Sequence, residues 1–110
     1  MAGKYLIKKA SNGQFYFNLL AGNSEKILTS ELYVAKASAI NGIESVKKNA
    51  GLDSNYEIRK DNKQQEYFVL KAKNHEIIGK SESYSSRSAL NNGIASVKSN
   101  ADSVIDDQAG

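Results

Sequence analysis

The only histidine of the chain, His75, is the residue best suited to acid–base chemistry. It stands next to Glu76, and an imidazole near a carboxylate can act as a proton acceptor or donor. The sequence contains an internal repeat in which each residue matches the one 51 positions later. In that repeat the residue that matches His75 is Ser24. We therefore expect His75 to be an exposed turn residue and assign no catalytic residue here.

A cluster of serines offers potential nucleophiles. Its members are Ser81, Ser83, Ser85, Ser86 and Ser88. No Gly-x-Ser-x-Gly element, second histidine or triad partner accompanies them. A polar connection into a helix, with one serine as the N-cap, explains the cluster without catalysis.

The sequence contains few residues that could bind a metal or a cofactor. The chain lacks cysteine, which excludes disulfides and thiolate metal sites. Asp102, Asp106 and Asp107 could hold a hard cation weakly, but they lack the EF-hand spacing, so we expect a solvated acidic tail. No glycine-rich phosphate loop follows a strand pattern. We expect no metal, no cofactor and no enzymatic activity.

Aromatic and basic residues on the first two predicted strands of each copy form the remaining candidate site. Alternation with period two places them on the sheet face opposite the helices. The candidate residues are Lys8, Tyr16, Asn18, Arg59, Tyr67 and Lys71. Such a face could stack bases and contact phosphates, as single-strand binders do. The simpler interpretation is a solvated face, because antiparallel sheets commonly expose one face and no RNP-like signature is present.

Composition and charge describe an ordinary globular protein. The 110 residues include 15 Lys and Arg against 12 Asp and Glu, a net charge of +3. Residues 1–51 carry +4 and residues 52–110 carry −1, so an anionic partner would meet the first half. An alternating pattern follows Met1-Ala2-Gly3-Lys4 directly, and no apolar stretch has signal-peptide or membrane-spanning length. We expect a cytoplasmic protein without a membrane partner.

The elements that must position these side chains arise from a tandem duplication. A displacement of 51 positions aligns residues 5–50 with 56–101 without a gap, and 22 of the 46 pairs are identical. We expect one domain, residues 1–110, made of two repeats at about residues 4–51 and 55–106. A unit of about fifty residues encloses too little area to fold alone, so both repeats must share one core. The internal duplication replaces dimerisation and predicts a monomer.

Each repeat has the pattern of three strands followed by a helix. Asn12-Gly13 predicts a hairpin between the first two strands, and Gly22-Asn23-Ser24 predicts the turn into a third strand at residues 26–30. The second copy has turns near residues 62–63 and 73–75. Residues 103–106 have the pattern of a short final strand. The predicted class is α+β, in the order βββα-βββα-β, with pseudo-twofold symmetry and both helices on one face of an antiparallel sheet.

A helix is predicted from about residue 35 to 49, with a matching helix 51 positions later. Ala39, Ile43, Val46 and Ala50 recur at intervals of four, three and four, which gives one buried stripe. Asn41-Gly42 could instead form a turn, but the stripe continues in phase on both sides. We expect Gly42 and its match Gly93 to lie inside the helices, at points where the backbone closely approaches the sheet.

Several stretches resemble the YegP-like family of bacterial proteins, in its duplicated form. They are Ala21-Gly22-Asn23 with Glu25, residues 27–33, residues 41–47, and Ala72 with residues 74–79. The resemblance implies β(3)-α-β units that form one sheet and exchange their last strands, so residues 104–105 would pair with the first repeat. Ser24 stands where many relatives have glycine, and the second copy lacks the Asn-Gly hairpin, so these turn types stay open.

The resemblance implies no biochemical activity, so the function must be inferred from the residues. Our leading hypothesis is a small non-enzymatic binding or protein-interaction module. The alternative is single-stranded nucleic-acid binding through the exposed sheet face. The sequence does not identify the partner.

Overall fold

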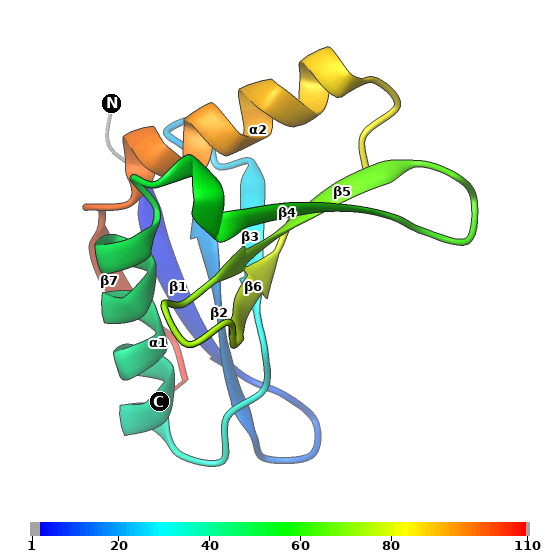
Figure 1. Ribbon diagram of the computed structural model, residues 1–110. Coiled ribbons are helices and arrows are strands. Elements are labelled where there is room, and N and C mark those ends of the chain that lie inside the picture. Colours follow the sequence, from blue (N-terminus) through cyan, green and yellow to red (C-terminus); the bar gives the residue numbers. More distant parts are fainter. Residues whose placement is uncertain (1–2, 110) are drawn as a thin grey trace.

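The computed structural model describes residues 3–109, which form one seven-stranded sheet and two helices (Figure 1). Residues 1, 2 and 110, which the expected domain includes, lie outside the described range. The elements are β1 (Lys4–Lys9), β2 (Phe15–Leu20), β3 (Lys26–Ser30), α1 (Lys36–Asn49), a short 3-10 helix (Asp53–Asn55), β4 (Tyr56–Lys60), β5 (Glu66–Lys71), β6 (Ile77–Lys80), α2 (Arg87–Asn100) and β7 (Val104–Asp107). The class and element order agree with the prediction from the sequence.

The sheet is mixed, and the expectation of an antiparallel sheet was wrong at one strand pair. The strand order is β4-β5-β6-β3-β2-β1-β7, and β7 runs parallel to β1. The Gly3 amide donates to Asn100 Oδ1 at 3.1 Å, so β1 begins beside the end of α2. The chain that leaves α2 therefore runs along β1 in the same direction. The expected pairing of residues 104–105 with the first repeat is confirmed.

The core lies between the sheet and the two helices. Side chains from both halves form one buried cluster, and in Figure 1 the helices cover the same face at a steep angle to each other. The largest fully buried members are Tyr5, Phe17, Phe68, Ile7, Leu19, Leu28, Ile43 and Leu70. Phe17 and Phe68 each contact a stacked tyrosine, with ring centroids 6.4 and 6.3 Å apart.

The helix prediction through Gly42 is confirmed, because α1 runs unbroken from Lys36 to Asn49. A Cβ atom at Gly42 would lie 2.9 Å from Phe17 Cε2 and would overlap the hydroxyl of Tyr33. Gly93 of α2 has the same relationship to Tyr84. Both glycines are therefore points of close approach, although the nearest atom belongs to a tyrosine before the helix and not to a strand backbone.

Residues with a left-handed backbone conformation, that is a positive φ, close the turns in both halves. Gly13 has a φ of 85°, and its match Gln64 has a φ of 67°. Ser24 and His75, which also match, have φ values of 67° and 70°. The two copies thus use similar turns even where the second lacks the Asn-Gly pair.

Candidate functional site

The predicted sheet-face residues form two separate pairs. The register places Lys8 opposite Tyr16 and Arg59 opposite Tyr67. However, β2 and β5 lie three strand steps apart, which is about 14 Å across the sheet. The two tyrosines therefore do not form one aromatic platform.

The centre of this face is not exposed, contrary to the expectation for Asn18. Only 2% of Asn18 is accessible, and its Oδ1 accepts a hydrogen bond from Thr29 Oγ1 at 2.9 Å. Asn18 lies on an interior strand, where Leu6 and Thr29 flank it on the neighbouring strands. Val69, the match of Asn18, is equally buried. The face therefore lacks an open central surface for a base.

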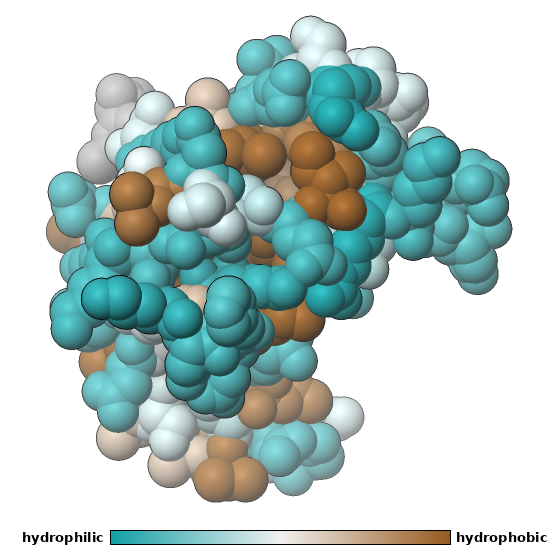
Figure 2. All heavy atoms as spheres, viewed as in Figure 1, coloured by the Kyte–Doolittle hydropathy of each residue, from teal (hydrophilic) through white to brown (hydrophobic). Residues whose placement is uncertain are grey.

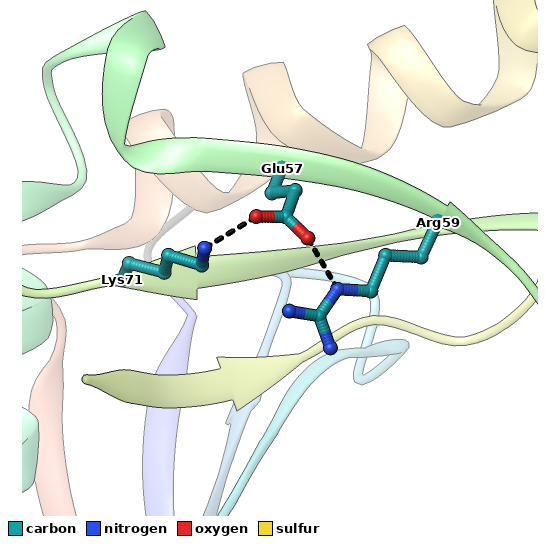
Figure 3. A network of polar contacts seen from close by, with 3 residues as sticks. All are labelled: Glu57, Arg59 and Lys71. Atoms are coloured by element: carbon teal, nitrogen blue, oxygen red, sulfur yellow. Dashed lines mark hydrogen bonds and ion pairs between the residues drawn. The ribbon is translucent and has the colours of Figure 1, made fainter. Parts of the chain in front are cut away.

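The two basic candidate residues of the second half, Arg59 and Lys71, are neutralised, which was not predicted from the sequence. Glu57 pairs with both Arg59 and Lys71, as Figure 3 shows. These two cations hold the pKa of the Glu57 carboxyl below its usual range, chiefly through the Lys71 hydrogen bond. The match of Glu57 in the first half is Leu6, so Lys8 lacks the equivalent carboxylate.

Most of the other residues considered as functional candidates lie on the surface or have structural roles. His75 is exposed in a turn, as expected. Ser86 is the N-cap of α2, and its Oγ accepts a hydrogen bond from the Ala89 amide at 3.1 Å, which confirms the N-cap prediction. The solvated acidic tail was wrong, because Asp106 and Asp107 lie in β7 and pair with lysines of the first half.

Polar residues from both halves meet in an open groove of about 710 Å³ beside α1, here called the α1 groove. One wall is the segment between β3 and α1, with Glu31 and Tyr33. Asn41 of α1 and Glu76 of the β5–β6 turn complete it. The remaining lining residues are Leu32, Ser38, Gly42, Ser45, Ala72, Asn74, His75, Ile77 and Ile78.

The α1 groove is acidic around Glu31, Tyr33 and Glu76. Burial raises the pKa of the Tyr33 hydroxyl, and the charges of Glu31 and Glu76 raise it further. Tyr33 therefore stays protonated at neutral pH and can donate a hydrogen bond. Asn74 fixes Glu76: its Nδ2 donates to Glu76 Oε1 at 2.6 Å and its Oδ1 accepts from the Glu76 amide. The groove offers oxygen acceptors for a cationic or hydrogen-bond-donating group.

A smaller groove of about 300 Å³ occupies the matching position beside Tyr84. It is lined by Glu25, Lys26, Ile27, Glu82 and Tyr84. Here too burial raises the tyrosine pKa, and Glu25 and Glu82 raise it further. In each groove the tyrosine comes from one half and one of the two glutamates comes from the other half.

Identity between the halves could have indicated this site, but it was not used to select candidate residues from the sequence. Glu31, Tyr33, Asn41 and Glu76 are all identical to their matches, whereas more than half of the matched pairs differ. Ser30 and Ser81 are also identical, but they accept hydrogen bonds from Phe17 and Phe68 amides and so have structural roles. What the sequence could not show is that residues 31–41 and 74–76 converge.

The family model for a domain of unknown function, DUF1508, matches the chain twice, over residues 10–57 and 61–107. The chain belongs to the DUF1508 family. It is similar to the UPF0339 protein YegP of Yersinia pestis, with 58% identity over 103 residues that cover 94% of this chain and 92% of the relative. The resemblance to YegP-like proteins is therefore confirmed.

Two solution NMR structures of DUF1508 relatives share the fold. The UPF0339 protein of Shewanella oneidensis has a TM-score of 0.92 and 49% identity, covering 99% of this chain and 93% of that chain. The protein of unknown function YegP from E. coli has a TM-score of 0.94 and 46% identity, covering 100% and 96%. The family is uncharacterised, so it supplies a fold without an activity. Within residues 3–109, neither 14-residue helix has the length or apolar character to cross a bilayer.

Proposed function

We propose that this chain is a small non-enzymatic binding module that holds a cationic side chain of another protein in the α1 groove. The observation that supports this proposal is the convergence of Glu31, Tyr33 and Glu76 from the two halves. Tyr33 also has a structural role, because it stacks on Phe17 and pairs with the Phe15 backbone. The carboxylates of Glu31 and Glu76 lie on exposed residues, and both glutamates are identical to their matches, which favours a binding role for the acidic groups.

The chemistry of the groove favours binding over catalysis. Its carboxylates can accept charge-assisted hydrogen bonds from an ammonium or guanidinium group. Tyr33 keeps its proton at neutral pH and so is a donor, not a base. His75 lines the groove, but Ser24 replaces it in the matching turn, so the shared features of the two grooves include no imidazole.

An NMR titration of the ¹⁵N-labelled chain tests this function. The probes are two short peptides that differ only by arginine or citrulline, since citrulline keeps the shape and removes the charge. We expect arginine-dependent shifts at Tyr33, Asn41 and Glu76. Glu31→Gln/Glu76→Gln should weaken binding about tenfold or more, the size expected for a charge-assisted pair.

Glu44→Gln is the matched control, because Glu44 is exposed on α1 outside the α1 groove and carries the same charge. It should leave binding unchanged. Equal shifts with the citrulline peptide, or equal losses in the control and the double variant, would refute a cationic ligand in this groove.

We further propose that the chain is a monomeric, cytoplasmic tandem duplication whose two repeats form a single pseudo-twofold domain. The double match of the family model and the matched grooves support this organisation. Residues 1–51 expressed alone should be unfolded, because their helix would lose its contacts with β5 and β6. A dispersed NMR spectrum from that fragment would contradict the shared core.

Single-stranded nucleic-acid binding is the second candidate function. It is favoured by the Lys8–Tyr16 pair in the more basic first half, where no Glu57 equivalent is present. Binding would be confined to this pair and would weaken steeply with salt. Titration with a mixed-sequence single-stranded oligonucleotide at two salt concentrations tests it, and an absence of shifts at Tyr16 removes it.

A further inference from the structure

The two outer strands of the sheet have unequal surroundings, although their sequences match. β1 is covered by β7, whereas β4 forms the opposite margin of the sheet in Figure 1. The stretch that matches β7, residues 53–56, forms the 3-10 helix and the start of β4 itself. It therefore cannot pair along the outside of β4.

The matched side chains of the two halves differ in burial in the same sense. Ile7 of β1 is fully buried, but its match Ile58 on β4 is 38% exposed. Ile43 of α1 is fully buried, and its match Ile94 is only partly buried. In the first half Gln108 donates to the Ile7 carbonyl at 2.9 Å, and Ala109 packs against the core. The second half lacks these covering residues.

The uncovered region forms a hollow of about 380 Å³ between β4 and α2, here called the β4 hollow. Its lining residues are Asp53, Tyr56, Ile58, Asn91, Ile94, Ala95 and Lys98. Figure 2 shows an apolar patch at this place, between α2 and the β4–β5 hairpin. The ion pair of Lys98 with Asp53 lies at one end of the hollow.

The backbone of β4 is oriented for strand addition. In an antiparallel pair, residues that exchange hydrogen bonds alternate with residues whose backbone groups point outward. The Asp61 amide donates to the Gln65 carbonyl, so Arg59 and Glu57 continue the ladder with β5. The N–H and C=O groups of Tyr56 and Ile58 therefore point toward the free edge. Tyr5 and Ile7, their matches, face β7 in the same way.

We propose that the β4 edge binds an extended segment of another protein, which adds as a parallel strand and places an apolar β-branched side chain in the β4 hollow. This site is separate from the α1 groove and does not depend on it. β7 shows the chemistry that fits a matching edge: valine and isoleucine followed by two aspartates that pair with lysines. Lys60 is exposed at the end of β4 and can meet an acidic residue.

A second copy of the chain is a poorer occupant through its β7. That strand already pairs with β1 of its own chain, so its transfer would free one edge for each edge that it filled. The free energy of strand pairing would cancel. A segment that is extended or unfolded in its own protein has no such cost, and backbone pairing gives it affinity while the hollow gives specificity.

The test uses the full ¹⁵N-labelled chain and a synthetic peptide with the sequence of residues 103–109, acetylated and amidated. We expect saturable shifts at Tyr56, Ile58 and Ile94 with the peptide at about 1 mM or below. A peptide with asparagine in place of isoleucine should bind at least about fivefold more weakly, because one buried aliphatic side chain is lost.

Ile58→Pro provides the decisive variant, because it removes an outward N–H without breaking the β4–β5 ladder. The NMR spectrum of Ile58→Pro should remain that of a folded protein, and its peptide affinity should fall about tenfold or more. Ile58→Val should change peptide affinity less than about threefold. The proposal is overturned by no shift at the highest concentration, by shifts confined to β1 and β7, or by equal binding to Ile58→Pro. Concentration-dependent dimerisation in sedimentation, lost in Ile58→Pro, would assign the edge to a second copy instead.

Discussion

The hydroxyl of Tyr5 donates a hydrogen bond to the carbonyl of Ala101, with 2.6 Å between the oxygens. Tyr5 lies in β1 of the first half, and Ala101 is the C-cap of α2 in the second. The reciprocal bond joins Tyr56 to the carbonyl of Ala50 at 2.7 Å. Each half therefore satisfies a free carbonyl at the helix C-terminus of the other, where intrahelical partners have run out.

Tyr5→Phe should destabilise the chain by about 1–3 kcal/mol, because the Ala101 carbonyl would remain buried without a partner. Tyr56 is only partly buried, so Tyr56→Phe should cost less. Urea unfolding followed by circular dichroism measures both. Tyr16→Phe is the control, and a Tyr5→Phe variant as stable as this control would contradict the role of the bond.

Stability should fall at alkaline pH, and Tyr5 should be a main cause. Tyrosine in an unfolded chain titrates near pH 10. Burial raises the pKa of Tyr5 in the folded chain, and the charges of Asp102 and Glu44 raise it further. Its contribution is thus complete below about pH 10 and is lost as pH rises above that value. Urea midpoints between pH 7 and 11 should fall less steeply for Tyr5→Phe than for Tyr16→Phe.

Gly42→Ala and Gly93→Ala should each destabilise by about 1–3 kcal/mol, although alanine favours helices by about 1 kcal/mol. The new methyl groups would overlap the side chains of Tyr33 and Tyr84. Gly51→Ala is the control, because its Cβ would enter open space. Thermal unfolding compares the three variants, and a Gly42→Ala chain that matched Gly51→Ala would show that Tyr33 moves freely aside.

Replacing the left-handed residues with glycine should stabilise the turns. Gln64→Gly and His75→Gly should each gain about 0.5–1 kcal/mol, because glycine adopts positive φ without steric strain. Gly13→Ala, at a φ of 85°, should have the opposite sign. Chemical denaturation gives the three free energies of unfolding, and a loss of stability in His75→Gly would indicate a further role for the imidazole.

The sequence predicted the elements well because their signals are local. Alternation, the buried helical stripe and the turn residues each act within a few positions. The direction of β7 was not predictable in this way, since it depends on where α2 ends relative to β1. The sheet was expected to be antiparallel because sequential strands joined by turns usually are.

The candidate site was less predictable because it depends on side chains that meet across long separations. Asn18 looked exposed by alternation, but neighbours on two adjacent strands bury it. Arg59 and Lys71 looked free, but Glu57 pairs with Arg59 on its own strand and with Lys71 on β5. Tyr33 and Glu76 lie 43 positions apart in the chain, and only the packing of one half on the other brings them together.

The pairing of β1 with β7 sets a condition on how the chain is made. Lys4 of β1 pairs with Val104 of β7, so the native sheet stays incomplete until β7 has been synthesised. Contacts of such long sequence separation slow folding and leave hydrophobic intermediates exposed for longer. Until β7 emerges, the edge of β1 stays open to chaperones or to neighbouring nascent chains.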